Sequence, residues 1–483
     1  MVKAPELMHN AAMSMDQAPT GISAEDWAAT PASVRLWIEA VLQRLAVLEE
    51  RVNQNSQNSS QPPSADPPNA PPRPTRTPSG RHRGAQPGHP GHHRRLKAVA
   101  KVQRVVEAKP TACHSCGALL LGEDPDPQRQ QVTELPRVEP LVTEYRRQTL
   151  TCLACGAQTT ADWPAEMPSG DFGPRLQATV GYLSGRLGLS QRDIEEACET
   201  LFHTELSLGS VSAQEAAVSA ALAQPVMAAQ SYVQQQPAAN VDETGWHEQS
   251  HRAWLWVAAT PLVAVFLLVA TRGAQAAKQL LGTAFAGVVG SDRWSAYNWL
   301  EPTHRQVCWA HLKRDFQKLV ERGGESHHLG HALLVEVETL FRLWGQVKAG
   351  TLRRDDFQVK VQPLRMRMHE LLQEGTHVPH TQTRHLCEHL LKLEVALWTF
   401  VSVEGVEPTN NHAERCLRRA VLWRRRSFGT QSSDGSLFVA RILTTVTTLR
   451  QQKRDVLDYL TAACAAAISG AEPPSLLPKS STN

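Results

Sequence analysis

The sequence has no strong excess of charge of one sign and no apolar stretch at its start. Lys and Arg total 50 against 47 Asp and Glu, a formal net charge of +3, so the charge of the whole chain indicates no class of partner. The first ten residues, MVKAPELMHN, lack the apolar region of a secretory signal. The nine cysteines are an odd number for a disulfide-bonded secreted fold and favour a reducing compartment. We therefore expect a cytoplasmic protein.

The sequence also lacks a convincing membrane span. The uncharged segment 253–270 is divided by Thr260-Pro261 and closely bracketed by Arg252 and Arg272. A span needs about 20 apolar residues, whereas two short apolar runs around a Pro-containing turn are typical of buried strands. We expect no membrane role.

What the chain does have is length and an uneven distribution of basic residues. Its 483 residues predict about three folded units, and 41% hydrophobic residues suffice for a sizeable core. From Pro67 to Pro110, ten Lys and Arg residues face the single acid Glu107, a local charge of +9. This segment indicates a polyanionic partner.

The N-terminal part contains a heptad pattern and then a linker. Apolar residues recur at alternating spacings of four and three, at Val34, Ile38, Val41, Leu45, Leu48 and Val52. The spacing predicts a helix over 34–52, either pairing in a short coiled coil or lying on its own domain. Residues 53–95 are rich in Pro, Ser, Gln and Gly and predict an unstructured linker. Its basic second half is a solvated tether or a phosphate-contacting arm, with candidate DNA-binding residues Arg81, Arg83, Arg94 and Arg95.

Two C-x2-C knuckles, each followed by glycine, give the strongest single motif. They are separated by 35 residues, and their cysteines are Cys113, Cys116, Cys152 and Cys155. Four thiolates fit tetrahedral Zn²⁺, so we expect a closed structural zinc site rather than a redox pair. The other five cysteines are expected to be buried structural thiols.

Helical periodicity follows over residues 183–222. It predicts helices at 193–204 and 211–222, with Ser190 capping the first, Gly209 between them and Ser210 before the second. The pair could be a DNA-reading helix-turn-helix, but the second helix carries no Lys or Arg, which favours an ordinary helical hairpin.

An α/β region and a helical block complete the chain. The β-branched runs 263–270 and 286–292 predict strands flanking a helix at 272–281. Residues 312–398 are amphipathic and helical, and further helices are expected at 407–426, 437–449 and 456–468.

Three carboxylates occupy positions that suit a shared site. Asp242 ends a short apolar run before Gly245, Asp292 ends a predicted strand, and Glu414 lies on a predicted helix. If they converge, their oxygens would select Mg²⁺, and two such ions support phosphodiester transfer. From spacing alone this indication is weak, and solvated turns are the usual explanation for Asp near Gly.

The surroundings of Glu414 favour the metal interpretation. Six arginines occupy twelve positions, namely Arg415, Arg418, Arg419, Arg424, Arg425 and Arg426. The first three share one helix face. A basic helix carrying one acid suits a cleft that holds a metal and a nucleic-acid backbone.

In combination, these motifs resemble the bacterial insertion-sequence sixty-six family of DDE transposases. The resemblance covers the heptad helix and linker, the 84–92 stretch, the doubled knuckle, and the core motifs DETG (242–245), SDRWSAY (291–297), CWAHLKR (308–314) and NHAER (411–415). Trp294 keeps loosely to a family pattern that places an aromatic residue two positions after the second Asp.

The resemblance implies an RNase H-like mixed-sheet core with a helical insertion at about 315–403. It implies that Asp242, Asp292 and Glu414 are the catalytic acids and hold two Mg²⁺ or Mn²⁺ ions. The resemblance selects Asp242 over Glu243, and strand alternation would point Glu243 away. Asn410, Asn411 and Arg415 would position the helix or a phosphate, and His311 would be structural or contact DNA. The implied reaction is direct phosphoryl transfer, first to water and then to a 3′-hydroxyl.

The fold class expected is therefore multidomain α/β, with a coiled-coil helix and a small zinc module. The units are an N-terminal region (1–52), the linker (53–95), the zinc module (96–165), a helical DNA-binding or packing region (166–235), the catalytic core (236–450), and a C-terminal helix and tail (451–483). Expected partners are the terminal repeats and target DNA, a second copy or more of the chain, and accessory proteins of the same element, close to the bacterial nucleoid. The alternatives are a catalytically inactive zinc-containing DNA-binding protein and a hydrolytic nuclease without strand transfer.

Overall fold

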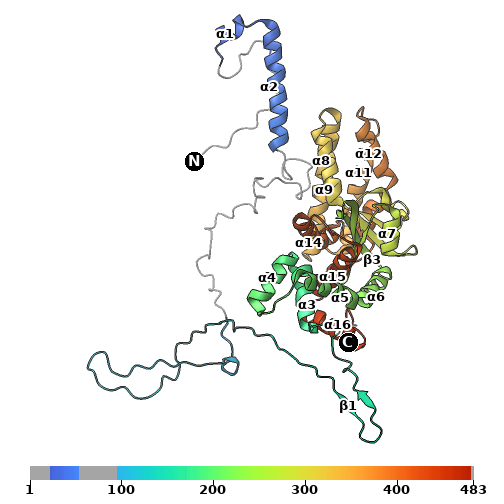
Figure 1. Cartoon of the computed structure of the whole chain (residues 1–483). Coiled ribbons are helices and arrows are strands. Elements are labelled where there is room, and N and C mark those ends of the chain that lie inside the picture. The colour runs from blue at the N-terminus through green and yellow to red at the C-terminus, as the bar shows by residue number, and fades with distance from the viewer. Residues whose placement is uncertain (1–21, 54–94, 169, 480–483) are drawn as a thin grey trace.

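The computed structural model describes residues 22–53, 95–168 and 170–479 (Figure 1). The short helix α1 (Ala24–Ala29) precedes α2 (Ala32–Asn53), which covers the predicted heptad helix. Figure 1 shows α2 standing away from the folded body, and apolar side chains such as Trp37 and Leu45 are exposed on it. Pairing through this helix stays a prediction.

Of the helices in the described residues, none combines the length and the apolar content that crossing a bilayer requires.

The body is organised around a five-stranded mixed sheet. Its order is β5-β4-β3-β6-β7, in which β3 pairs antiparallel with β4 and parallel with β6. β4 pairs antiparallel with β5, and β6 pairs parallel with β7. The strands are β3 (Ala238–Glu248), β4 (His251–Ala259), β5 (Ala264–Val269), β6 (Val288–Ser291) and β7 (Arg305–Val307).

The expectation that Asp242 stands at the end of a strand is wrong. β3 continues six residues beyond it, because the hairpin with β4 stays paired from Asn240↔Ala259 to Glu248↔His251. The two short runs within 253–270 are strands, as expected from the Pro-containing turn.

Alternating side chains of the sheet bury both of its faces. On β4, Trp256 and Ala258 belong to one core cluster, which is completed by α7 (Ala274–Leu281) and α16 (Val456–Ser469). Leu255 and Val257 belong to the opposite cluster, together with α14 (Asn411–Ser427). The central strand β3 is therefore enclosed, and α14 covers the face of Leu255 and Val257.

Helix α15 (Ser433–Gln451) covers the edge strand of the sheet. The backbone N–H of Phe266 donates to Thr444 Oγ1 at 2.9 Å, and that of Ala264 donates to Thr448 Oγ1 at 3.1 Å. Side-chain hydroxyls thus satisfy donors of the edge strand β5 that would otherwise invite another strand.

The region before the sheet is helical. It comprises α3 (Pro174–Tyr182), a π-helical turn (Leu183–Leu187), α4 (Gln191–Phe202), α5 (Leu208–Ala221) and α6 (Ala223–Gln234).

The caps of this helical region were predicted in part. Ser190 caps α4 as predicted, and its partner Asp193 completes a capping box. The predicted start of the second helix is wrong: Ser207 is the cap, and Gly209 and Ser210 lie in the first turn of α5. Glycine is tolerated there because an N-terminal turn lacks intrahelical partners for its N–H groups.

A second helical block is inserted between β7 and α14 and has its own core. Leu312, Leu333 and Phe400 are among the residues buried in it. The helices are α8 (Trp309–Glu321), α9 (Gly324–Lys348), α10 (Arg354–Lys360), α11 (Gln362–Gly375), α12 (Thr381–Lys392) and α13 (Glu394–Ser402). The helix predicted to start at residue 407 starts at Asn411 instead. Pro408 disfavours a helical backbone at the residue before it, Glu407.

Candidate functional site

The side chains of Asp242, Asp292 and Cys308 lie level with one another where the parallel pairing of β3, β6 and β7 ends. The last paired residues of β3 and β6 are Asn240 and Gly290, so Asp242 and Asp292 follow two positions later on each strand. Ser291 pairs with Val307 of β7, which places Cys308 beside Asp292 in the same row. Neighbouring strands lie about 4.8 Å apart, so the register alone brings these side chains to one edge.

Glu414 reaches this row from α14, and Asn410 holds the helix in place. Asn410 is 1% exposed, and its Nδ2 donates to the carbonyl of Val241 at 2.7 Å. Its Oδ1 accepts from Asn240 Nδ2 at 3.0 Å, and its backbone N–H donates to Cys308 Sγ at 3.1 Å. One buried residue therefore ties the start of α14 to β3 and to the end of β7. Asn411 is exposed.

The charges of Asp292 and Glu414 act on Asp242, although among the described residues the ligand atoms of these three acids do not all lie within 4.8 Å of one another. Burial raises the pKa of Asp242 well above its usual value, and the charges of Glu243, Glu414 and Asp292 raise it further. We call Asp242, Asp292 and Glu414 the acid cluster. Mutual repulsion of this kind is relieved by protonation or by a bound cation.

Glu243 is a neighbour of the cluster with a different role. Its side chain is 2% exposed, and Oε1 forms an ion pair with Arg272 at 2.8 Å. Its other oxygen, Oε2, accepts from the Tyr297 hydroxyl at 3.0 Å. Burial and the charge of Asp292 raise the pKa of Glu243, while Arg272 lowers it. These contacts occupy the carboxylate and anchor Tyr297 from the turn after β6.

Two arginines that sequence reasoning missed shape the turn after Asp292. Arg305 is 1% exposed, and its Nη2 donates to the carbonyl of Asp292 at 2.9 Å. The guanidinium of Arg272 lies 4.3 Å from the ring centre of Trp294, whose backbone N–H donates to Asp292 Oδ1. No sequence signal marked Arg305, because its β-strand position looks like that of an ordinary surface residue.

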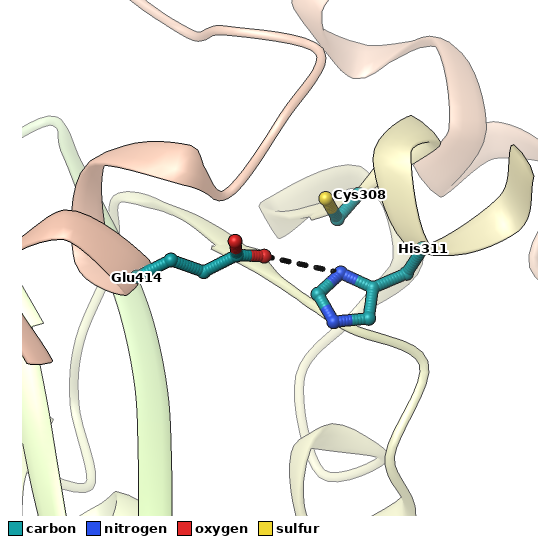
Figure 2. Close-up of side chains that lie close together, drawn as sticks. All are labelled: Cys308, His311 and Glu414. Atoms are coloured by element: carbon teal, nitrogen blue, oxygen red, sulfur yellow. Dashed lines mark ion pairs between the residues drawn. The ribbon is translucent and has the colours of Figure 1, made fainter. Parts of the chain in front are cut away.

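Cys308 and His311 join Glu414 in a cluster that could hold a metal ion (Figure 2). The ligand atoms of the three side chains all lie within 4.8 Å of one another, and His311 Nδ1 is 3.6 Å from Glu414 Oε1. Both of these atoms are buried without a hydrogen-bond partner. Burial raises the pKa of Cys308 to about 11, and burial together with Arg314 lowers that of His311. The expectation that Cys308 is only a buried thiol missed this grouping, which the Cys-x2-His spacing could have signalled.

The arginines of α14 divide into groups with different surroundings. Arg415 and Arg419 line a cavity of about 330 Å³ together with Arg186 and Arg450. Arg424 Nη1 donates to Thr244 Oγ1 at 3.1 Å and to the carbonyl of Gly245, so it holds α14 against β3. The remaining ones, Arg418, Arg425 and Arg426, are exposed. Of the linker arginines, Arg95 is exposed, while Arg81, Arg83 and Arg94 lie outside the described residues.

Each of the two cysteine knuckles is formed locally. In each, the glycine N–H donates to the carbonyl of the first cysteine, and Gly117 and Gly156 adopt φ of +72° and +75°. The backbone N–H groups of the second cysteines, followed by those of their preceding residues, lower the pKa of Cys113 and Cys152. Within a knuckle the geometry therefore favours thiolates.

The structure differs from the expected four-thiol site in one respect: it does not bring the two knuckles together. Among the described residues, Cys113, Cys116, Cys152 and Cys155 do not form one metal-ligand cluster within 4.8 Å. Cys116, Cys152 and Cys155 are exposed free thiols, and Cys113 is a half-buried one.

The physical reason is that the module has no core to hold its halves against each other. None of residues 95–165 is buried. The second knuckle lies in the hairpin of β1 (Thr149–Thr151) and β2 (Gln158–Thr160), which extends away from the body (Figure 1). Small metal-binding modules commonly fold only when the metal joins their ligands. A shared zinc site for the two knuckles therefore stays a prediction.

A mixed sheet with acids on and just after two parallel-paired strands, faced by a helix, defines an α/β protein with a candidate divalent-metal site. The sequence comparisons give the family: residues 169–436 match the transposase IS66 family, and the chain belongs to it. Residues 22–95 match a second family, whose function is unknown.

Two curated relatives come from Sinorhizobium fredii, and both are named as uncharacterized proteins. The protein y4hP is 26% identical over 402 residues, covering 74% of this chain and 71% of the relative. The protein y4qI is 27% identical over 233 residues, covering 43% of this chain and 42% of the relative.

Proposed function

We propose that this chain is a DDE transposase that binds the ends of its own element, cleaves a DNA strand there and joins it to target DNA. Family membership supports the class of activity. The mechanism is supported by the level positions of Asp242 and Asp292 on adjoining chain segments and by the charges of Asp292 and Glu414, which raise the pKa of Asp242. The mixed sheet with the first acid on its central strand supports an RNase H-like core.

The acid cluster fits divalent cations. Burial raises the pKa of Asp242, and the charges of Glu243, Glu414 and Asp292 raise it further, so a cation there would relieve an unfavourable negative charge. Glu414 Oε1 is buried without a hydrogen bond, so it can accept a ligand bond. Carboxylate oxygens are the ligands that Mg²⁺ prefers, and Mn²⁺ accepts them as well. Bound at such a site, two cations would lower the pKa of the attacking water or hydroxyl and stabilise the leaving oxygen.

The chain's own residues position the reacting groups. Asn410 and Arg424 fix α14, and therefore Glu414, relative to β3. Arg305 fixes the backbone of Asp292, and Arg272 holds the following turn through Trp294. Such positioning contributes to rate by holding the phosphodiester and its nucleophile in line.

Further modules are proposed to bring DNA and partners to this site. The basic segment before residue 110 and the exposed arginines of α14 would contact phosphates. The helix α2 would pair two copies of the chain, as pairing of element ends requires. Cys113 and Cys116 would share a structural Zn²⁺ with Cys152 and Cys155 once the two knuckles come together.

The experiment is cleavage of a supercoiled plasmid that carries the DNA flanking the gene, with Mg²⁺, by wild type and Asp242→Asn. We expect Asp242→Asn to cleave at least about a thousandfold more slowly, because it removes a metal ligand worth several kcal/mol of charge stabilisation. DNA binding should be kept. Glu248→Gln, further along the same strand, is the matched control and should cleave like wild type.

The outcomes separate the alternatives. Breaks at the ends that are joined to other DNA support the transposase. Breaks without joining indicate a nuclease, and binding without breaks in wild type indicates a catalytically inactive DNA-binding protein. Equal cleavage by Asp242→Asn and wild type would contradict the proposed role of the acid cluster.

The zinc proposal has its own test. Cys152→Ser should lower the zinc content of the purified protein from about one ion per chain to near zero, because a structural site needs all four ligands. Cys116→Ser, in the other knuckle, should do the same if the two knuckles share one ion. Ser115→Ala leaves all four thiols and is the control. Zinc content unchanged in Cys152→Ser would remove the structural site.

A further inference from the structure

Four arginines meet in one cavity without a carboxylate partner. The cavity of about 330 Å³ is lined by Arg186, Arg415, Arg419 and Arg450, which we call the arginine pocket. Among the described residues, none of these four guanidinium groups forms an ion pair. The remaining lining residues bring no acid: they are His412, Cys416, Leu443, Val446, Thr447 and Gln451.

The pocket leaves strong hydrogen-bond donors unused. Arg186 Nε, Arg419 Nε and Arg419 Nη2 are buried without a hydrogen-bond partner. A buried donor without a partner costs about 1–3 kcal/mol, and more for a charged group. Burial and the neighbouring Arg186 and Arg426 also lower the pKa of Arg419. An anion that accepts several N–H bonds would relieve both costs at once.

The backbone brings these arginines together through a close approach of two elements. Arg186 lies in the π-helical turn Leu183–Leu187, and Gly185 of that turn packs so tightly on α15 that a Cβ would clash with the Ile442 side chain. Gly188 ends the turn with φ of +69°, and a Cβ there would lie 3.4 Å from Arg419 Nη2. π-Helical turns are frequent at functional sites. Here the turn places Arg186 beside the arginines of α14.

The ligand is best identified by its chemistry. Planar guanidinium groups from three elements match the several oxygens of a phosphate. The cavity is far larger than one water molecule, so it admits a phosphate together with what is attached to it. Arg415 of the pocket follows Glu414 directly in sequence, so the pocket and the acid cluster are held by the same turn of α14.

We propose that the arginine pocket binds one phosphate group of the DNA backbone and fixes the strand relative to the acid cluster. The proposal rests on the proposed function only in taking DNA as the source of the phosphate. Free inorganic phosphate offers the same chemistry and is the other source that the experiment separates.

The test is a scan with methylphosphonates, which replace single DNA phosphates by neutral groups. Binding of the flanking-end duplex is measured in the full chain carrying Asp242→Asn, with and without Arg419→Gln. In the chain that keeps Arg419, neutralising the DNA phosphate at one position should weaken binding about tenfold. With Arg419→Gln, binding should already be weakened about tenfold, and neutralising that position should cost nothing more. The slope of log K against log salt should fall by about 0.9, the value for one phosphate contact.

Arg418→Gln is the matched control, since Arg418 is exposed on the same helix outside the cavity. Arg418→Gln should weaken DNA binding, but neutralising the coupled DNA phosphate should weaken binding by the same factor in this variant as in the chain that keeps Arg418. Arg450→Gln, on α15, should reproduce the coupling and guards against a folding defect particular to Arg419→Gln, as thermal unfolding of each variant also does.

Each outcome decides the proposal. Coupling at one phosphate for Arg419 and Arg450 but not for Arg418 supports it. Equal, uncoupled losses in all three variants overturn it, as does an unchanged salt slope. If sodium phosphate at constant ionic strength raises the melting temperature of wild type but not of Arg419→Gln, and no DNA position is coupled, the pocket takes free phosphate and the DNA proposal fails. Strand cleavage by wild type is measured separately. If the DNA proposal for the arginine pocket fails but wild type cleaves, the proposed function is kept. If coupling is found but wild type does not cleave, the pocket proposal is kept and the proposed function fails.

Discussion

The two sides of the first turns of α14 carry clusters of opposite charge. On one side, Glu414 lies near the row of Asp242 and Asp292, where the parallel pairing of β3 with β6 ends. On the other, Arg415 and Arg419 join Arg186 and Arg450 in the arginine pocket. Each cluster brings groups of like charge together. A single helix, α14, separates the acid cluster from the arginine pocket.

The two clusters differ in how they tolerate being without a ligand. A carboxylate can take up a proton, and the raised pKa of Asp242 shows that it does so more readily than usual. A guanidinium cannot lose its proton in practice. The acid cluster can therefore lower its own repulsion, whereas the arginine pocket stays positive at every physiological pH. Only an anion from outside the chain relieves it.

The largest effect on stability should come from replacing Asn410, whose side chain fixes the acid cluster but does not line the arginine pocket. Asn410→Ala deletes the two buried hydrogen bonds of the side chain, and we expect it to lower the free energy of unfolding by about 2–4 kcal/mol. Stabilisation by Mg²⁺ should be lost, while stabilisation by phosphate through the arginine pocket should remain. Denaturant unfolding with and without each ligand measures both.

Asn411→Ala is the control for this prediction, because Asn411 is the exposed neighbour in the same turn. It should change stability by less than about 0.5 kcal/mol. If the two variants behaved alike, Asn410 would not be the residue that joins α14 to the sheet.

A smaller effect of opposite sign is expected on the arginine side. Without DNA and at low salt, Arg419→Gln should raise the free energy of unfolding by about 0.5–1 kcal/mol, because it removes repulsion from neighbouring arginines. The gain should vanish near 1 M salt, where the screening length falls to about 3 Å. Arg418→Gln should show no comparable gain. A loss of stability in Arg419→Gln at low salt would mean that the pocket is not electrostatically strained.

Local sequence patterns predicted much of the fold. Ser190 and the apolar periodicity predicted α4, and Thr260-Pro261 correctly divided two strands. Errors arose where pairing partners decide the outcome. β3 continues past Asp242 because β4 supplies partners as far as Glu248, which no feature of residues 238–248 alone reveals.

The sequence predicted the acids of the candidate site but not the residues that position them. Asp242, Asp292 and Glu414 were recognisable because two of them follow apolar runs and the third lies on a basic helix, together with the family resemblance. Arg305 and Arg186 act through neighbours that are distant in sequence. Arg186 lines a cavity with residues more than 200 positions away, and only the folded chain shows that these arginines have no acid between them.

The cysteine knuckles show the limit of a spacing argument. The Cys-x2-Cys-Gly pattern predicted the local turn of each pair, Cys113 with Cys116 and Cys152 with Cys155, because that turn depends only on adjacent residues. Spacing carries no information on whether two such turns meet. That depends on burial between them, and residues 95–165 bury nothing.

The buried amide of Asn410 also sets when the site can exist. Its partner Asn240 lies 170 residues earlier in the chain. At a synthesis rate of about 5–20 residues per second, roughly 10–30 s pass between the two positions. Late in that interval Asp242 and Asp292 have been made, but Glu414 and the residue that seats it have not. A nascent chain therefore carries an incomplete acid cluster until the helical insertion and α14 have been made and α14 can dock.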